Sequence, residues 1–160
     1  MTIKAGDKIP SGKLKYMGPN GPAELSTDEL FKGKKVVVFG LPGAFTPTCS
    51  AKHVPGFVQQ AAAIKGKGVA TIACVSVNDA FVMGAWGKDQ GSGDKVMMLA
   101  DGSATFTKSI GLEQDLSAAG LGVRYKRYAM VVDDGKVKWL GIEEAPGLSV
   151  SSAESVLKQL

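Results

Sequence analysis

Cysteine, histidine and long hydrophobic runs are scarce in this sequence, and each shortage excludes a class of protein. Only two cysteines, Cys49 and Cys74, and one histidine, His53, occur among 160 residues. They make neither a disulfide framework nor a zinc-ligand set, so we expect no metal or cofactor. No segment reaches the roughly 18 consecutive apolar residues of a membrane helix, and the first residues lack the apolar core of a secretory signal. We therefore expect no membrane association and a cytoplasmic protein, although an organellar protein that has lost its transit peptide would show the same features.

A large excess of charge of one sign is also missing. Lysine and arginine number 19 against 15 acidic residues, which leaves a net charge of +4. The small basic clusters flank apolar segments and lack the interleaved aromatic residues of a nucleic-acid groove. We expect solvated surface there, and no nucleic-acid partner.

What is present is the composition of an ordinary folded domain. Hydrophobic residues make up 44% of the chain and charged residues 21%, which is typical of globular proteins. The sequence has no internal repeat, low-complexity tract or long linker. We therefore expect residues 1–160 to form a single domain.

Apolar runs and turn signals predict a mixed sheet. Two β-branched runs without polar alternation, 35–41 and 69–77, are typical of strands that are covered on both faces, as in a parallel sheet. Asp133-Asp134-Gly135 between 124–132 and 136–142 is a hairpin signal and makes that pair antiparallel. Two further strands are predicted at 13–16 and 95–100, with a turn at 18–22 and a short segment near Leu25 that complete an N-terminal hairpin extension.

One predicted helix carries the first cysteine. It begins after Thr46 as N-cap and Pro47 at the first helical position, and it runs to Lys65 with a kink or break at Pro55-Gly56. Other helices are predicted at 28–31, at 80–88 after the cap pair Asn78-Asp79, at 103–110, and at 152–160 with Ser152 as cap. The order of elements predicts an α/β, thioredoxin-like fold with a mixed central sheet and flanking helices. Sites in such sheets form beyond the carboxyl ends of parallel strands, where Pro42 to Cys49 falls.

Cys49 is the candidate nucleophile. In the first helical turn a thiol meets unpaired N–H groups and the positive end of the helix dipole, which favour the reactive thiolate. The alternative is a small buried hydrophobe, as free cysteines often are.

The residues around Cys49 resemble a known family. The stretch 42–49, Pro-Gly-Ala-Phe-Thr-Pro-Thr-Cys, matches the Pro-x-x-x-Thr/Ser-x-x-Cys pattern of peroxiredoxins in the form of their "five" or type II branch. The resemblance extends over essentially the whole chain, through 52–57, 76–82, Trp86, 99–101 and 126–132.

The resemblance implies a thiol peroxidase with defined site residues. Cys49 would attack a hydroperoxide and become a sulfenic acid, while Thr46, the Cys49 N–H and the guanidinium of Arg127 donate to the leaving oxygen and Pro42 shields the thiolate. Arg124 is the rival of Arg127 on the same predicted strand, and periodicity does not choose between them. The family pattern chooses Arg127.

Three further residues have weaker assignments. His53 lies four residues after Cys49 and would share its helix face, but a Cys-His pair is disfavoured because no third residue is evident to orient the imidazole. The resemblance also places Phe45 and the region of Phe81 near a homodimer contact, so we expect a homodimer.

Turnover requires a second thiol to reduce the sulfenic acid. The C-terminal cysteine of animal relatives is absent, since the corresponding stretch 147–152 is Gly-Leu-Ser-Val-Ser-Ser. Cys74 is the remaining resolving candidate, although a mid-strand residue is expected to be buried and its use would require the Cys49 helix to unwind. We favour external recycling by glutathione and glutaredoxin or by thioredoxin.

Other reactive-cysteine classes fit less well. A thioredoxin-like disulfide oxidoreductase would need Cys-x-x-Cys, but Cys49 is followed by Ser-Ala-Lys. A cysteine phosphatase would need an arginine where Pro55 stands. A redox sensor that uses Cys49 stoichiometrically stays open.

Overall fold

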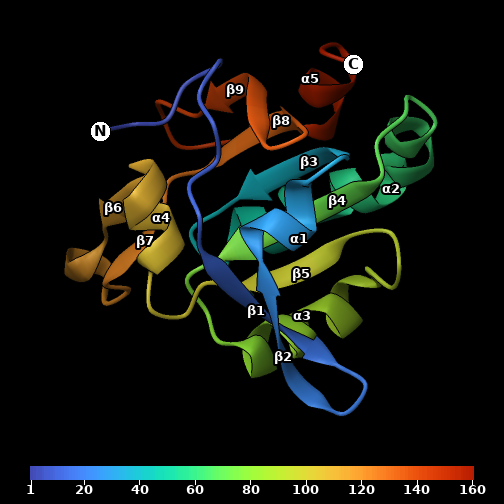
Figure 1. Cartoon of the computed structure of the whole chain (residues 1–160). Helices are drawn as coiled ribbons and strands as arrows, with labels where there is room; N and C mark the ends of the chain where they lie inside the picture. The colour runs from blue at the N-terminus through green and yellow to red at the C-terminus, as the bar shows by residue number, and fades with distance from the viewer.

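A computed structural model describes residues 1–160 and contains one large sheet (Figure 1). Its seven strands follow the order β2-β1-β5-β4-β3-β8-β9. Strands β3, β4 and β5 are mutually parallel, while β1 and β8 run antiparallel to their neighbours in this core. The strands are β1 Lys13–Gly18, β2 Gly21–Ser26, β3 Lys35–Gly40, β4 Thr71–Ser76, β5 Met97–Ala100, β8 Tyr128–Asp133 and β9 Lys136–Ile142. This mixed sheet with flanking helices confirms the predicted thioredoxin-like α/β fold.

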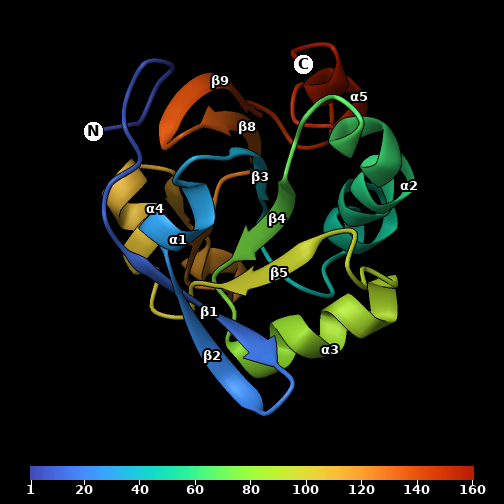
Figure 2. The same ribbon diagram turned by 45° about the vertical axis from the view of Figure 1, so that its right-hand side comes forward.

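Helices cover both faces of the sheet, as Figure 2 shows. The helical segments are α1 Thr27–Phe31, the π-helix η1 Cys49–His53, α2 Val54–Lys65, α3 Ala80–Gln90, α4 Thr105–Ile110, the 3₁₀ turn η2 Ser117–Ala119 and α5 Ala153–Leu157. Residues of α2, α3 and α5 pack on one face, and residues of α1 and α4 on the other. None of these helices has the length and apolar character that crossing a membrane requires.

The central strand shows why the predicted run is uniformly apolar. Val37 and Phe39 of β3 enter one core, and Val36 and Val38 enter the other. Because successive side chains of a strand point to opposite faces, both sets must be apolar when both faces are covered. The hairpin signal is also confirmed, since Asp133 pairs with Lys136 across Asp134 and Gly135, which both have positive φ.

The predicted strand 124–132 is wrong, because the chain forms two strands there. β7 (Val123–Tyr125) pairs with β6 (Glu113–Asp115) in a separate two-stranded sheet, and β8 begins at Tyr128. The Lys126 amide donates to the Leu112 carbonyl (2.7 Å), and β8 begins two residues later, so residues 126 and 127 leave one sheet before the chain enters the other. The three-residue, polar β6 had no periodic signal in the sequence.

The helix after Thr46 differs from its prediction in two respects. It starts at Pro47 as expected and the Thr46 carbonyl accepts from the Ser50 amide (2.9 Å), but the Thr46 hydroxyl donates backward to the Gly43 carbonyl (2.7 Å) and caps nothing. The helix also continues through Pro55, where a kink or a break was predicted, and no break occurs there. The π turn η1 directly precedes it, with the Val54 amide bonded to the Cys49 carbonyl. A π turn is wider than an α-helical turn and tolerates Pro55, which has no N–H to donate.

Two other helix boundaries shift for local reasons. α4 begins at Thr105, not at Ser103, because Ala104 is left-handed and the Asp101 carboxylate accepts from the amides of Phe106 (3.1 Å) and Thr107 (3.0 Å). α5 ends at Leu157, short of the predicted 160, while its predicted cap Ser152 does accept from the Ser155 amide.

Candidate active site

The loop Pro42–Thr46 and Cys49 lie beyond the carboxyl end of β3. Cys49 opens the π turn η1 and is completely buried, in the same core that contains Cys74. The helix it belongs to starts two residues earlier, so the sulfur lies in the first turn, near N–H groups without helical partners. This position is compatible with a thiolate.

The loop is held from two sides. The Ala44 amide donates to Oδ1 of Asn78 (2.9 Å), and the Ser76 hydroxyl donates to the same oxygen (2.5 Å). On the other side the Arg124 guanidinium donates from Nη1 to the Pro42 carbonyl (2.9 Å). The loop residue Phe45 has a φ of 61°, a left-handed conformation that is strained for this residue type. These bonds fix the loop in that shape.

Arg127 is the arginine that contacts the thiol. Its Nη2 donates to Cys49 Sγ (3.2 Å), and its carbonyl accepts from the Glu143 amide (2.9 Å). Arg124, the rival candidate, instead binds Pro42 and, through Nε, the Leu121 carbonyl (2.9 Å). A guanidinium beside a sulfur stabilises negative charge on it and offers further N–H donors to a bound oxygen.

His53 holds the other edge of Arg127. Its Nδ1 lies 2.8 Å from Arg127 Nη1, and its Nε2 lies 2.9 Å from the Ser151 carbonyl. Guanidinium only donates and a carbonyl only accepts, so the ring must be neutral with its hydrogen on Nε2. Burial and then the charge of Arg127 lower the pKa of His53 to about 3, although Ser151 and Glu143 act in the opposite direction. The ring therefore has no free lone pair to serve Cys49 as a base.

Thr46 and Pro42 lie on the same loop, as expected. The Thr46 hydroxyl, however, is arranged to accept a hydrogen bond from a ligand and not to donate one. Its hydroxyl hydrogen is committed to the Gly43 carbonyl, which leaves the oxygen as an acceptor. A hydroperoxide carries an O–H that such an acceptor can bind. The expectation that Thr46 donates to the leaving oxygen therefore does not fit this arrangement.

Cys74 lies in the middle of β4, opposite Phe39 of β3. Both cysteines are free thiols, and Cys74 is completely buried. Burial and then the neighbouring Cys49 raise the pKa of Cys74 well above its usual value, while Arg127 lowers it less. Cys74 is thus a poor nucleophile in this conformation.

Two aromatic side chains are exposed near the loop. Phe45 is 55% exposed and Phe81, in the first turn of α3, is 65% exposed. The Ala44–Asn78 hydrogen bond joins the segments that carry them. Trp86 of α3 donates from its indole to the hydroxyl of Ser50 (3.0 Å), which ties α3 to the residue after Cys49.

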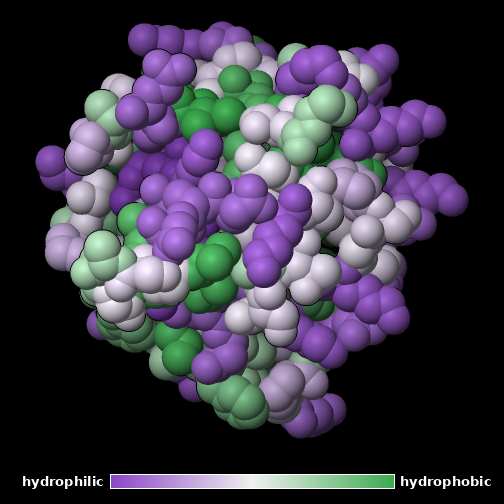
Figure 3. Space-filling view, turned by 90° about the vertical axis from the view of Figure 1, so that its left-hand side faces the viewer, coloured by the Kyte–Doolittle hydropathy of each residue, from purple (hydrophilic) through white to green (hydrophobic).

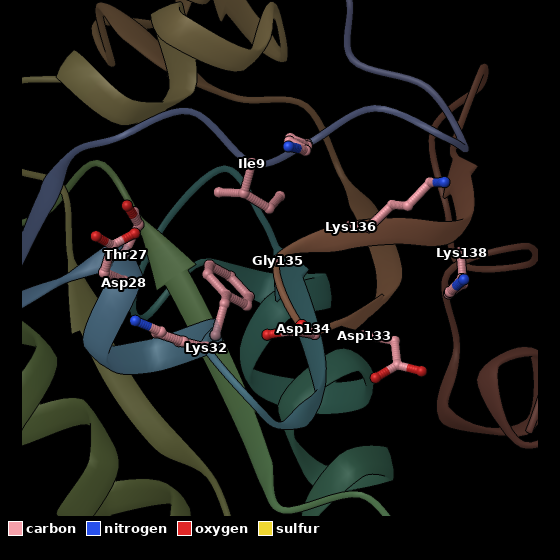
Figure 4. Close-up of a pocket in the computed structure, with 11 residues that line it drawn as sticks. Ile9, Thr27, Asp28, Lys32, Asp133, Asp134, Gly135, Lys136 and Lys138 are labelled. Carbon is pink, nitrogen blue, oxygen red and sulfur yellow. The ribbon is translucent and has the colours of Figure 1, made fainter.

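A separate pocket of about 550 Å³ lies at the opposite end of β3 (Figure 4). Its walls come from the N-terminal segment, α1 and the β8–β9 turn, and they carry lysines and aspartates such as Lys32, Lys136 and Asp133. It contains no thiol. The face over α4 and the N-terminal segment has only small hydrophobic areas among hydrophilic side chains (Figure 3). No group of three or more His, Cys, Asp or Glu side chains is arranged to hold a metal ion.

Sequence reasoning missed several residues that shape this site. Asn78 was expected to cap a helix, but only Asp79 does so, by accepting from the Val82 amide (2.8 Å). A pair of Cys49 and His53 was disfavoured, and His53 is instead buried and contacts Arg127. Ser151 and Glu143 gave no signal, because their contacts join segments far apart in the chain.

Comparisons with known proteins agree with this geometry. A family model described as Redoxin matches residues 4–157. Peroxiredoxin-2E, chloroplastic, of Arabidopsis thaliana is 52% identical, over 99% of this chain and 70% of the relative. Peroxiredoxin-2C of Oryza sativa subsp. japonica is 50% identical, over 99% of this chain and 98% of the relative. Reduced Prx3 from Vibrio vulnificus, solved in complex with H2O2, has a TM-score of 0.95 and 47% identity, with 99% of each chain covered.

A match over this much of the chain shows the family to which the protein belongs, and not the fold alone. The Redoxin match and the relatives at about half identity span nearly all residues, including 42–49 and 126–132. This protein therefore belongs to the peroxiredoxin family, alongside the plant type II members, as a thiol peroxidase with an antioxidant function.

Proposed function

We propose that Cys49 reduces hydrogen peroxide and alkyl hydroperoxides. The thiolate attacks the terminal oxygen, the O–O bond breaks as the S–O bond forms, and the departing oxygen takes a proton from water to leave as water or an alcohol. Sulfur is oxidised to the sulfenic acid and the peroxide is reduced. The observation that carries this proposal is the Arg127 Nη2 contact to Cys49 Sγ at 3.2 Å.

The neighbouring groups have distinct proposed roles. Arg127 stabilises the thiolate and the charge that develops on the leaving oxygen, helped by the Cys49 N–H. Thr46 accepts from the O–H of the bound peroxide, consistent with its own bond to Gly43. Pro42 lies between β3 and the helix and keeps water from the thiolate. The complex of Vibrio vulnificus Prx3 with H2O2 supports hydrogen peroxide as one substrate.

We propose that external thiols complete the cycle. A thiol condenses with the sulfenic acid to give a mixed disulfide and water, and a second thiol releases reduced Cys49 and a disulfide. Glutathione with glutaredoxin, or thioredoxin, would supply both thiols. The place of Cys74 in the middle of β4 and its raised pKa argue against its direct use as the resolving thiol.

The test measures peroxide consumption by the wild type, Cys49→Ser and Cys74→Ala with each reducing system in turn. We expect wild type and Cys74→Ala to turn over with at least one donor and Cys49→Ser to be inactive. The donor that sustains turnover identifies the recycling partner. Loss of turnover in the Cys74→Ala variant would establish Cys74 as the resolving cysteine. A single oxidation of Cys49 that no donor reverses would indicate a redox sensor.

Assembly and location are also proposals. A homodimer is supported by the exposed Phe45 and Phe81, which lie on segments bonded to each other. The cytoplasm is the proposed compartment, because its glutathione and thioredoxin systems keep thiols such as Cys49 and Cys74 reduced. Cell fractionation with an antibody to the protein tests the location.

A further inference from the structure

Residues 143–151, called here the C-terminal loop, join β9 to α5 and fold around one carboxylate. Oε2 of Glu143 accepts from the amides of Ser149 (2.8 Å) and Ser151 (2.8 Å) and from the Ser151 hydroxyl (2.7 Å). Oε1 accepts from the Ser149 hydroxyl (2.8 Å). No lysine or arginine forms an ion pair with Glu143. The carboxylate is therefore held by four neutral donors, all from two residues of the loop.

A continuous set of hydrogen bonds leads from this loop to the thiol. The Ser151 carbonyl accepts from His53 Nε2, Arg127 Nη1 donates to His53 Nδ1, and Arg127 Nη2 donates to Cys49. Ser151, His53 and Cys49 are all buried, with exposures of 0%, 1% and 0%. Because water does not compete at these positions, each bond constrains the next.

We propose that Glu143 is a positioning residue for Arg127: by fixing Ser151, it presents the carbonyl that keeps the His53 hydrogen on Nε2 and leaves Nδ1 to accept from Arg127. The inference rests on the proposed peroxidase function and extends it to a residue that does not touch the reacting atoms. Glu143 is also tied to Arg127 directly, since its amide donates to the Arg127 carbonyl (2.9 Å).

The tautomer is the step that transmits the position of the loop. If the Ser151 carbonyl moved away, Nε2 would lose its acceptor and the hydrogen could transfer to Nδ1. An N–H on Nδ1 would face the N–H groups of Arg127, and the two donors would repel each other. The guanidinium would then shift from Cys49, and a small displacement of a catalytic group lowers rates strongly.

The hydrogen bonds of Glu143 predict how strongly each variant is affected. Glu143→Ala removes all four bonds. Glu143→Gln can place its carbonyl oxygen where Oε2 lies and turn its amide to the Ser149 hydroxyl, which can rotate to accept. Glu144→Ala is the matched control, because Glu144 is exposed and makes no hydrogen bond or ion pair, yet its loss changes the net charge equally.

The kinetic experiment compares kcat/KM for hydrogen peroxide in these three variants with the donor that supports the wild type. We expect Glu143→Ala to lose about tenfold, with Glu143→Gln and Glu144→Ala within about twofold of wild type, and KM for the reductant unchanged. A Glu143→Gln variant as slow as Glu143→Ala would overturn the proposal, because charge and not hydrogen bonding would then be the cause.

A spectroscopic readout separates positioning from mere stabilisation. His53 is the only histidine, so its imidazole nitrogens give one unambiguous set of NMR signals. We expect a single tautomer with the hydrogen on Nε2 in wild type and Glu143→Gln, and a tautomer mixture in Glu143→Ala. A rate loss without a tautomer change contradicts the proposal, as does a wild-type rate in Glu143→Ala. If the wild type has no peroxidase activity, the proposed function fails, while the tautomer comparison still decides the role of Glu143.

A double-mutant cycle keeps the proposal testable if Glu143→Ala folds poorly. The double variant Ser149→Ala/Ser151→Ala removes two hydroxyl donors and keeps both backbone amides. Its effect on kcat/KM should be present with His53 intact and absent in a His53→Gln background, because the loop acts through that ring. An equal effect of the Ser149→Ala/Ser151→Ala change on kcat/KM in the two backgrounds would overturn the proposal.

Discussion

At the scale of single residues, two arginines three positions apart have separate tasks. Arg127 lies with one edge on Cys49 and the other on His53, whereas Arg124 supports the backbone of Pro42. The flat guanidinium suits both positions, because it directs several N–H groups to different acceptors at once. A lysine would keep the charge and lose this fixed geometry.

We predict different outcomes for the two lysine variants. Arg127→Lys should lower kcat/KM for hydrogen peroxide about 100-fold, because one point charge cannot bond both Cys49 and His53. Arg124→Lys should lower it less, since it alters only the support of the loop. Stopped-flow measurement of thiol oxidation gives both values, with thermal melting as a check on folding. Equal losses would mean that Arg127 has no special relation to the thiol.

His53 predicts a dependence of stability on pH. Its pKa is about 3 in the folded protein and 6.5 when unperturbed, so between these values the unfolded chain binds a proton that the folded chain does not. The stabilising contribution is complete above pH 6.5 and is lost as pH falls toward 3. By pH 5 the loss should be about 2 kcal/mol.

Urea unfolding at pH 7 and pH 5 measures this effect. His53→Gln should be less stable than wild type at pH 7, but its free energy of unfolding should fall by about 2 kcal/mol less on acidification, because glutamine does not titrate. The comparison of the two proteins cancels the contributions of the other titrating groups. The same pH slope in both proteins would show that His53 is not held neutral by its surroundings.

At the scale of elements, β3 and β8 approach each other closely where β3 ends and the loop of the site follows. Gly40, the last residue of β3, pairs with Tyr128, the first of β8. A Cβ at Gly40 would overlap the Tyr128 ring and come within 3.0 Å of Tyr125. Both tyrosines are completely buried and stacked with centroids 6.0 Å apart, so neither ring has space to move away.

Gly40→Ala should therefore be strongly destabilising. We expect a loss of about 3 kcal/mol in the free energy of unfolding, at the upper end for overpacked cores. Gly12→Ala is the control, because its Cβ would make only ordinary contacts at 3.7 Å and 3.8 Å. Chemical denaturation measures both, and a Gly40→Ala variant as stable as the control would contradict this account of the strand pair.

At the scale of the whole molecule, the two faces of the sheet are closed by helices and the exposed aromatics lie outside both cores. Phe45 and Phe81 are the most exposed large hydrophobic side chains after Met1. Neither contributes to the two buried clusters. Exposed aromatic side chains are typical of an interface between protein molecules.

We predict that Phe81→Ser weakens self-association without unfolding the chain. Wild type should elute as a dimer at micromolar concentration and the variant as a monomer, in size-exclusion chromatography with light scattering. Val150→Ser, which removes an exposed apolar side chain of the C-terminal loop, is the control and should stay dimeric. A monomeric wild type, or a dimeric Phe81→Ser, would remove the proposed interface.

Local patterns in the sequence were sufficient to predict most of the helices and strands. The apolar run of β3, the Asp-Asp-Gly hairpin turn and the Pro47 helix start each depend on neighbouring residues, and each is found where it was predicted. The errors fall where tertiary contacts override local preference. Residues 126 and 127 leave one sheet before the next begins, and the Thr46 hydroxyl donates to the Gly43 carbonyl and does not cap the helix.

The sequence by itself determined the fold class and placed Cys49 at a helix start beyond a buried strand, because these features follow from periodicity and turn chemistry along the chain. Only the tertiary structure decided which groups meet that sulfur. The link from Glu143 through Ser151 and His53 to Arg127 joins residues up to 98 positions apart, as between His53 and Ser151. Such contacts arise from the packing of separate elements onto one sheet, and no local pattern encodes the distances between them.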